Sequence, residues 1–466
     1  MVSLTRWQRV GLMVALCVGV LGVAFEMWSI NSTMTLIAAP NALNGMQQYS
    51  WAFTMFSLGQ VFAIIGVGRL VDRFGAFKPF AVGTFIFIVG LTLAGSAHHI
   101  YTFLAARAVQ GLGGGTLNIA LMVVIAEVFP GRQRSNMMTV FSFCYLLPAF
   151  IGPGVASFIA VSIGWRYVFW LIIPLMVVAA AIGVRPFFEL YKGRVSRGAV
   201  HEEMPVWAAV AAIGGLAIIQ AVTQTVGGKL VHAIEGQWIA LAVVGLVAVA
   251  VSMRRLMPPG FWRIRPGMPA LMWVRMTLAG SYAASLNFLV LMLTGARSLG
   301  QQQASWLLPI GAVGWTLGMA LQSRSWLKVR RDQIIKIGAV LTTTCMASVA
   351  VFAGLVKVPS SLIMPILLVA GFGMGLAVSS TSLALMTLSP PESIGRNTSS
   401  LQVADGLGSA FFVGVAGTIW AALHLNHTWQ FTFSWLYSVN AFVSLLALLL
   451  AIARLGHVRN ESSGYG

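Results

Sequence analysis

The stretch from Gly68 to Lys78 reads Gly-Arg-Leu-Val-Asp-Arg-Phe-Gly-Ala-Phe-Lys and lies between two long apolar runs. It combines basic residues, one acidic residue and two glycines, and glycine allows tight turns because it tolerates backbone conformations that other residues avoid. A charged, turn-forming segment between apolar runs of this length is typical of a loop that joins two membrane-spanning helices. The segment therefore predicts that the chain crosses a membrane on either side of it.

The composition of the 466-residue chain independently indicates a membrane protein. Apolar residues make up 58% of the sequence and charged residues only 9%, which is too little polar surface for a soluble globule of this size. A spanning helix needs about 20 mostly apolar residues, and fourteen such runs follow one another along the chain. The sequence therefore predicts an all-α polytopic membrane protein, with both termini on one side because the number of spans is even.

The distribution of basic residues predicts which side that is. Lys and Arg are concentrated in cytoplasmic loops, and cytoplasmic termini place most of the 29 Lys and Arg residues on the cytoplasmic face. Outer loops then hold only Arg166, Lys229, Arg297 and Lys357. We therefore expect cytoplasmic termini. The formal charge of +18 is attributed to this asymmetry and to contact with anionic lipids, not to nucleic-acid binding.

Two apolar runs near the middle of the chain, 206–223 and 238–253, lack the polar and glycine-rich interruptions of their neighbours. They have the character of an insert, and without them six spans remain on each side. Paired six-span repeats pack around a binding site near the middle of the membrane. The predicted organisation is an N-terminal six-helix bundle over 1–188, a linker with two extra spans over 189–267, and a C-terminal six-helix bundle over 268–466.

The loop from Gly68 to Lys78 resembles the signature loop between spans two and three of the major facilitator superfamily. Further matches narrow the resemblance to its fourteen-span drug:proton antiporters: a fourth-span pattern, a fifth-span Gly-Pro pair and the opening of span six. The fourth-span pattern consists of Leu104, Arg107, Gln110, Gly111 and Gly113. The fifth-span pair is Gly152 and Pro153, which the resemblance assigns to helix packing. The opening of span six comprises 165–169 with Pro174. The resemblance implies two six-helix bundles of the major facilitator type with two inserted helices, and solute transport by alternating access without a cofactor.

The resemblance also implies a conformational gate at the cytoplasmic face of the first half. Its residues come from the signature loop and from the cytoplasmic end of span four: Gly68, Asp72, Arg73, Gly75, Glu127, Arg132 and Arg134. Ion pairs that hold in one state and break in another can shift a conformational equilibrium. The alternative is a solvated loop that obeys only the positive-inside rule. The second half has a basic counterpart of this loop at 322–331, without its Gly and Asp pattern.

Glu26 and Arg107 are the first pair of ionisable residues expected inside spans, where a charge costs roughly 2.5 to 3.5 kcal/mol on insertion scales. They fall at similar depths in spans one and four, which predicts an ion pair. Protonation of a carboxylate depends on its burial and its partner, so a conformational change can drive proton uptake or release. The alternative is a static pair that locks the two spans together. The resemblance favours coupling, because the fourth-span Arg is associated with it in that family.

Asp405 and Arg275 form the second candidate pair, in spans thirteen and nine. We expect Asp405 to be the one acidic side chain within the spans of the second half. It is too short to reach the headgroups and needs either a partner or a wet cavity, whereas Arg275 can extend to the membrane surface alone. Asp405 is therefore a candidate for proton coupling or for binding a cationic substrate.

Polar and aromatic side chains in spans of both halves are candidates for a substrate cavity: Trp28, Asn31, Asn118, Tyr145, Tyr282, Asn287, Trp315 and Gln402. Flexible Met and flat aromatic surfaces accept molecules of varied shape, so a lining of this kind suits amphipathic compounds. The alternative is that the 22 Met and 27 Phe are ordinary lipid-facing side chains.

These observations predict a secondary active transporter, a proton-coupled exporter of lipophilic or amphipathic compounds that acts as a monomer in a bacterial cytoplasmic membrane. Its partners are the substrate, protons and membrane lipids, with no metal, cofactor or nucleic acid. A dedicated exporter of one lipid, siderophore or metabolite would share every motif. An integral-membrane enzyme is the alternative from another class, but metal-ligand spacings are lacking and the candidate histidines lie at outer ends of spans.

Overall fold

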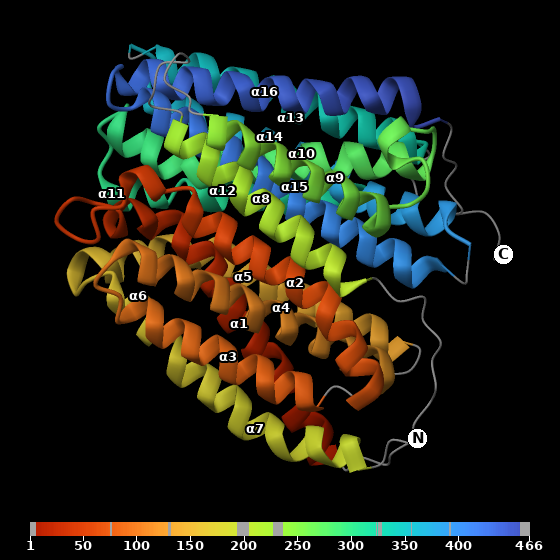
Figure 1. Cartoon of the computed structure of the whole chain (residues 1–466). Helices are drawn as coiled ribbons and strands as arrows, with labels where there is room; N and C mark the ends of the chain where they lie inside the picture. The colour runs from red at the N-terminus through yellow and green to blue at the C-terminus, as the bar shows by residue number, and fades with distance from the viewer. Residues whose placement is uncertain are drawn as a thin grey trace. The chain divides into compact units, whose positions relative to one another are not determined.

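A computed structural model describes residues 6–74, 77–128, 132–192, 205–226, 236–322, 324, 329–355, 357–390 and 393–456. Over these residues the chain is helical and has no strands (Figure 1). Fourteen of the described segments are long and apolar enough to cross a membrane. The predicted all-α fold and the predicted number of spans are both confirmed.

The chain forms two compact units, each with its own packing. The first comprises Met1–Met46 and Met55–Glu203, and the second comprises Gln47–Thr54 and Met204–Gly466. The first unit is built from α1 (Arg6–Ile37), most of α2 (Trp51–Phe74), α3 (Phe77–Gly95), α4 (Ile100–Val128), α5 (Arg132–Ser162), α6 (Arg166–Trp170) and α7 (Ile172–Lys192). Within it, α1 packs against α5 and α7, and α3 packs against α4.

The second unit holds the remaining helices: α8 (Val206–Val226), α9 (Gly236–Leu256), α10 (Met268–Gly295), α11 (Gln301–Ser305), α12 (Leu308–Gln322), α13 (Arg331–Gly354), α14 (Ile363–Leu388), α15 (Ile394–Leu423) and α16 (Trp429–Arg454). The short 3₁₀ turns η1 (Met46–Gln48), η3 (Phe261–Arg263) and η4 (Ser360–Leu362) precede α2, α10 and α14. The two helices predicted as an insert, α8 and α9, pack against each other, and α8 also packs against α15. By packing, the insert therefore belongs with the second unit.

Glycines bring the fourth span of each six-span repeat close to its neighbours. A Cβ added at Gly111 of α4 would collide with the carbonyl oxygen of Phe56 in α2. A Cβ added at Gly371 of α14 would collide in the same way with the carbonyl oxygen of Gly311 in α12. Only glycine permits such an approach of two backbones, so equivalent helices in the two units use the same packing device.

The signature loop is shorter than the sequence suggested. Helix α2 continues to Phe74, and α3 begins at Phe77, so most of the stretch predicted as a loop is helical.

Candidate functional site

The predicted ion pair between Glu26 and Arg107 is present in the first unit. Arg107 Nη1 on α4 donates to Glu26 Oε1 on α1 and, at 2.7 Å, to Gln110 Oε1. The Arg107 Cζ atom also lies 4.6 Å from the centroid of the Phe56 ring. The side chains of Arg107 and Glu26 are 1% and 0% exposed, so the pair is sealed from solvent.

This sealed pair leaves part of the carboxylate unused. Glu26 Oε2 is buried and accepts no hydrogen bond from any residue that the structure describes, and the adjacent Gln110 Nε2 likewise has no acceptor there. A buried polar atom without a partner is costly, and a native structure holds few of them. Oε2 is therefore the oxygen that can take up a proton while Oε1 keeps its contact with Arg107.

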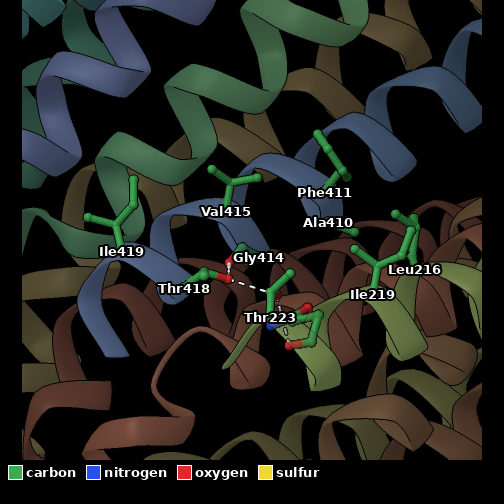
Figure 2. Close-up of a pocket in the computed structure, with 10 residues that line it drawn as sticks. Leu216, Ile219, Thr223, Ala410, Phe411, Gly414, Val415, Thr418 and Ile419 are labelled. Atoms are coloured by element: carbon green, nitrogen blue, oxygen red, sulfur yellow. Dashed lines mark hydrogen bonds between the residues drawn. The ribbon is translucent and has the colours of Figure 1, made fainter. Parts of the chain in front are cut away.

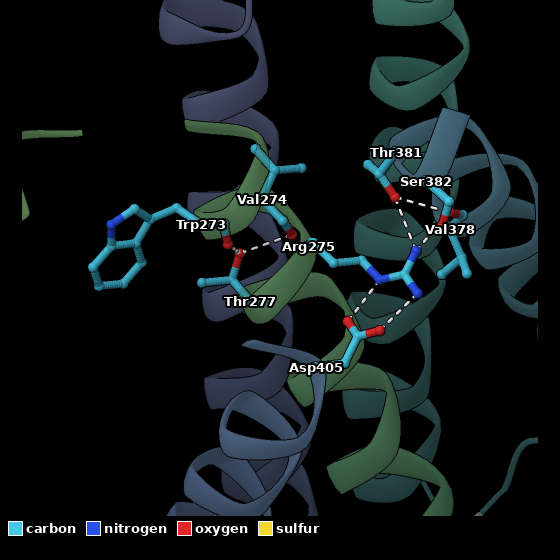
Figure 3. A network of polar contacts seen from close by, with 8 residues as sticks. All are labelled: Trp273, Val274, Arg275, Thr277, Val378, Thr381, Ser382 and Asp405. Atoms are coloured by element: carbon cyan, nitrogen blue, oxygen red, sulfur yellow. Dashed lines mark hydrogen bonds and ion pairs between the residues drawn. The ribbon is translucent and has the colours of Figure 1, made fainter. Parts of the chain in front are cut away.

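The second predicted pair, Arg275 and Asp405, is also present (Figure 3). Arg275 Nε donates to Asp405 Oδ1 and Arg275 Nη2 to Asp405 Oδ2, both at 2.6 Å. Arg275 Nη1 binds α14 through the carbonyl oxygen of Val378 at 2.5 Å and Thr381 Oγ1 at 2.9 Å. The guanidinium group therefore joins α10, α14 and α15, and both carboxylate oxygens of Asp405 are occupied.

This pair is more accessible than the first. The side chain of Asp405 is 28% exposed and that of Arg275 is 11% exposed. Accessible charges within a span need water or a polar ligand nearby. Asp405 is therefore the more exposed of the two paired carboxylates, and Arg275 occupies both of its oxygens.

A third acidic side chain lies within a span, so the prediction that Asp405 is the one acid in the spans of the second half is wrong. Asp332 lies at the start of the α13 span, and its side chain is 0% exposed. Arg330 donates to both of its carboxylate oxygens at 3.0 and 2.7 Å, and Lys336 Nζ lies 3.2 Å from Oδ2. The sequence places Asp332 directly after the basic 322–331 segment. That position could have predicted an ion pair, because a single acidic residue among basic ones attracts their side chains.

The predicted gate cannot be placed from the structure's side chains. The backbones of Gly68, Asp72 and Arg73 lie in α2, that of Glu127 lies in α4, and those of Arg132 and Arg134 lie in α5, but their side chains lie outside the described part of the chain. Gly75 lies outside the described residues altogether. The gate stays a prediction.

The candidate cavity residues are divided between the two units. In the second unit the rings of Tyr282 and Trp315 lie 5.6 Å apart, and the carbonyl oxygen of Asn287 accepts a hydrogen bond from Tyr49 at 3.0 Å. In the first unit Asn31 Oδ1 and Asn118 Oδ1 are buried without a donor among the described residues. Trp28 and Tyr145 are half-buried, and Gln402 is exposed. Their grouping around one substrate stays a prediction.

The Gly-Pro pair of span five lies inside α5, which continues through Pro148 and Pro153. A Cβ at Gly152 would lie 3.5 Å from the Cβ atom of Trp28 and 3.7 Å from the Phe25 ring. These are ordinary van der Waals distances, so Gly152 faces α1 but that contact has room for a methyl group. No group of three or more His, Cys, Asp or Glu residues is placed to hold a metal ion within the described ranges.

Comparison with known proteins assigns the family. A family model described as "Major Facilitator Superfamily" matches residues 16–413. The chain is 27% identical over 417 residues to a probable triacylglyceride transporter of Mycobacterium leprae, across 82% of this chain and 78% of that protein. It is 31% identical over 137 residues to multidrug transporter protein MdtP of Bacillus subtilis, but this match spans only 29% of the chain and 25% of MdtP.

Solved structures show the same fold at low identity. A peptide transporter POT in complex with sulfate superposes with a TM-score of 0.70 at 14% identity, covering 96% of both chains. The nucleoside transporter NupG superposes with a TM-score of 0.66 at 12% identity, covering 96% of this chain and 99% of that one. The chain therefore belongs to the major facilitator superfamily, and its fourteen candidate spans fit the fourteen-span type.

Proposed function

We propose that this transporter is a proton-coupled exporter of lipophilic or amphipathic compounds. The observation that carries the proposal is the sealed Glu26–Arg107 pair, in which Glu26 Oε2 has no hydrogen-bond donor among the described residues. The names of MdtP and of multidrug resistance protein 3 of Bacillus subtilis support the substrate class. The second of these is 26% identical over 179 residues, 35% of its length.

In the proposed cycle, Glu26 exchanges a proton with one side of the membrane in one state and with the other side in the next. Protonation at Oε2 removes the charge that Arg107 faces and so weakens the contact between α1 and α4. A group that is charged in one state and neutral in the other couples the proton gradient to the conformational equilibrium. Asp405 would add a second exchange, in which a proton or a cationic substrate replaces Arg275.

The remaining predictions belong to the same proposal. The signature-loop charges form the inner gate, and the aromatic and polar candidate residues contact the substrate. The termini lie in the cytoplasm, as the basic residues indicate, the membrane is that of a bacterium, and the transporter works as a monomer.

A dedicated lipid exporter is the second candidate function. It is favoured by the Mycobacterium leprae relative, which matches 82% of this chain and is named as a probable triacylglyceride transporter. A lipid and a lipophilic drug both require an apolar cavity, so the two functions differ in the number of compounds moved and not in the motifs.

Transport by purified protein in liposomes separates these functions. Liposomes carrying an imposed pH gradient are supplied with ethidium, with a neutral lipophilic dye or with fluorescent triacylglycerol. A polyspecific exporter moves both dyes and stops when a protonophore collapses the gradient. Movement of triacylglycerol alone supports the dedicated exporter. A transport rate that does not depend on the pH gradient contradicts proton coupling.

A further inference from the structure

A cavity of about 210 Å³ lies between α8 and α15, both in the second unit (Figure 2). Its walls are mainly apolar and include Leu216, Ile219, Ala410 and Phe411, with Gln220, Thr223 and Thr418 as polar lining. An apolar cavity of about 150 Å³ is large enough to hold benzene, whereas sites for drug-sized molecules are about 300 to 1,000 Å³. The cavity therefore suits a small molecule or the apolar end of a longer one.

The polar side chains of the lining all lie toward one end of the two spans, and the deeper part of the lining is apolar. Gln220 and Thr418 are each five residues from the ends of their spans, Thr225 and Leu423, or about 8 Å at 1.5 Å per residue. By the same measure Leu216 and Phe411 lie about 14 to 18 Å from those ends. An amphipathic molecule in a membrane has the same order, with its polar group near the headgroups and its apolar part deeper.

Gln220 supplies a free hydrogen-bond acceptor at the polar end. The residue is 4% exposed, and its Nε2 donates to Ser50 Oγ at 3.2 Å. No described residue donates to its Oε1. A Cβ added at Gly414, which also lines the cavity, would lie 3.2 Å from that oxygen. The carbonyl oxygen of the carboxamide is thus held against the cavity wall, where the absence of a side chain at Gly414 leaves it room.

The other polar groups of the lining are already engaged. Thr418 Oγ1 lies 2.9 Å from Thr223 Oγ1 and 3.0 Å from the carbonyl oxygen of Gly414, and Thr223 Oγ1 donates to the carbonyl oxygen of Gln220 at 3.1 Å. Gln220 Oε1 is therefore the acceptor at this end that has no donor among the described residues. Phe411, in the deeper part of the lining, is 40% exposed.

We propose that the cavity between α8 and α15 binds a small lipophilic molecule that carries one hydrogen-bond donor, a hydroxyl or an amine, which Gln220 Oε1 accepts. The inserted helix α8 supplies that acceptor, so the site depends on the insert. The inference concerns binding alone and holds whether or not the proposed proton coupling is correct.

Photolabelling of the full-length transporter in lipid nanodiscs tests the site. The probe is an eight-carbon alcohol with a diazirine in its chain, and the control probe is the same compound without the hydroxyl. We expect saturable labelling of α8 and α15, suppressed by excess octanol, and about three- to tenfold stronger for the alcohol, as one hydrogen bond allows. Labelling that does not saturate, or that is equal for the two probes, means bulk lipid only and overturns the proposal.

Two matched variants separate the acceptor from helix docking. Gln220 and Gln224 both donate to Ser50 Oγ, at 3.2 and 2.7 Å, but only Gln220 lines the cavity. Gln220→Leu should abolish the preference for the alcohol and keep labelling by the control probe, whereas Gln224→Leu should behave as wild type. Equal loss in both variants would show that docking of α8 is responsible, and would overturn the proposal.

A third variant fills the space. Gly414→Val should reduce labelling by both probes by about tenfold, since the new side chain occupies the cavity next to Gln220. Unchanged labelling of a monodisperse Gly414→Val protein contradicts the site. If this variant does not fold, the comparison of Gln220→Leu with Gln224→Leu tests the site by itself.

Discussion

The two ion pairs use the same chemistry in opposite settings. In the first unit, Arg107 and Glu26 are completely enclosed and one carboxylate oxygen is left without a donor among the described residues. In the second unit, Arg275 holds both oxygens of Asp405, yet the carboxylate side chain is 28% exposed. The enclosed pair has a free atom but no access, and the open pair has access but no free atom.

This contrast suggests a division of roles. An enclosed carboxylate exchanges protons only when the helices around it move, which is what coupling to a conformational cycle requires. An accessible carboxylate held by a replaceable partner can exchange that partner for a cationic ligand in either state. We therefore propose proton coupling first for Glu26 and cation recognition first for Asp405.

The largest expected effect is that of Glu26→Gln on driven transport. The substitution preserves volume and removes the titratable group, so export in a pH gradient should fall by roughly a hundredfold, while dye binding at equilibrium changes little. Flux of ethidium into or out of liposomes, with and without a gradient, measures both. Gradient-driven export at the wild-type rate would show that Glu26 does not carry coupling.

The next effect is on stability, and it should differ between the pairs. Arg107→Ala leaves a sealed carboxylate without its cation, and we expect a loss of about 3 to 5 kcal/mol, as for other broken buried pairs. Arg275→Ala should cost less, about 1 to 2 kcal/mol, because the side chain of Asp405 is partly exposed. Unfolding of the purified variants in mixed micelles with increasing SDS gives the comparison.

A double variant checks that the cost comes from the pair itself. Glu26→Gln combined with Arg107→Ala should be no less stable than Arg107→Ala alone, since no uncompensated charge remains. Additive losses would mean that each residue is held by separate contacts. Equal losses for Arg107→Ala and Arg275→Ala would remove the distinction between an enclosed and an open pair.

A smaller effect is expected from Asp405→Asn, and only for some substrates. If Asp405 binds cations, the variant should export ethidium with about a tenfold higher KM and a neutral dye at the wild-type rate. Asp405→Asn with Arg275→Gln tests the structural alternative, in which the double variant recovers stability that the single variant loses. Equal export of both dyes by a stable Asp405→Asn protein excludes both roles.

The ion pairs could be predicted from the sequence for a physical reason. Helix rise is constant, so counting from the ends of two spans gives comparable depths, and a charge in hydrocarbon requires a counterion. Asp332 escaped this reasoning because it lies one residue inside its span, where a charge is easily taken for a headgroup-level residue. The contact of Gln220 with Ser50 could not be predicted, because depth does not say which faces of distant helices meet.

The smallest expected effect concerns Thr381, which tests how firmly Arg275 is held away from the substrate. Arg275 Nη1 has two acceptors on α14, the Val378 carbonyl oxygen and Thr381 Oγ1. Thr381→Val removes one of them at nearly constant volume, so we expect a loss of about 0.5 to 1.5 kcal/mol and slightly faster exchange of Asp405 with cations.

Ser382→Ala is the matched control for Thr381→Val. Ser382 Oγ donates to the same Val378 carbonyl oxygen at 3.0 Å but makes no bond to Arg275 that the structure describes. Unfolding in SDS and the KM for ethidium should therefore change in Thr381→Val and stay at wild-type values in Ser382→Ala. If both variants shift alike, α14 packing and not the guanidinium contact is responsible, and Arg275 must be released from Asp405 by some other rearrangement of the second unit.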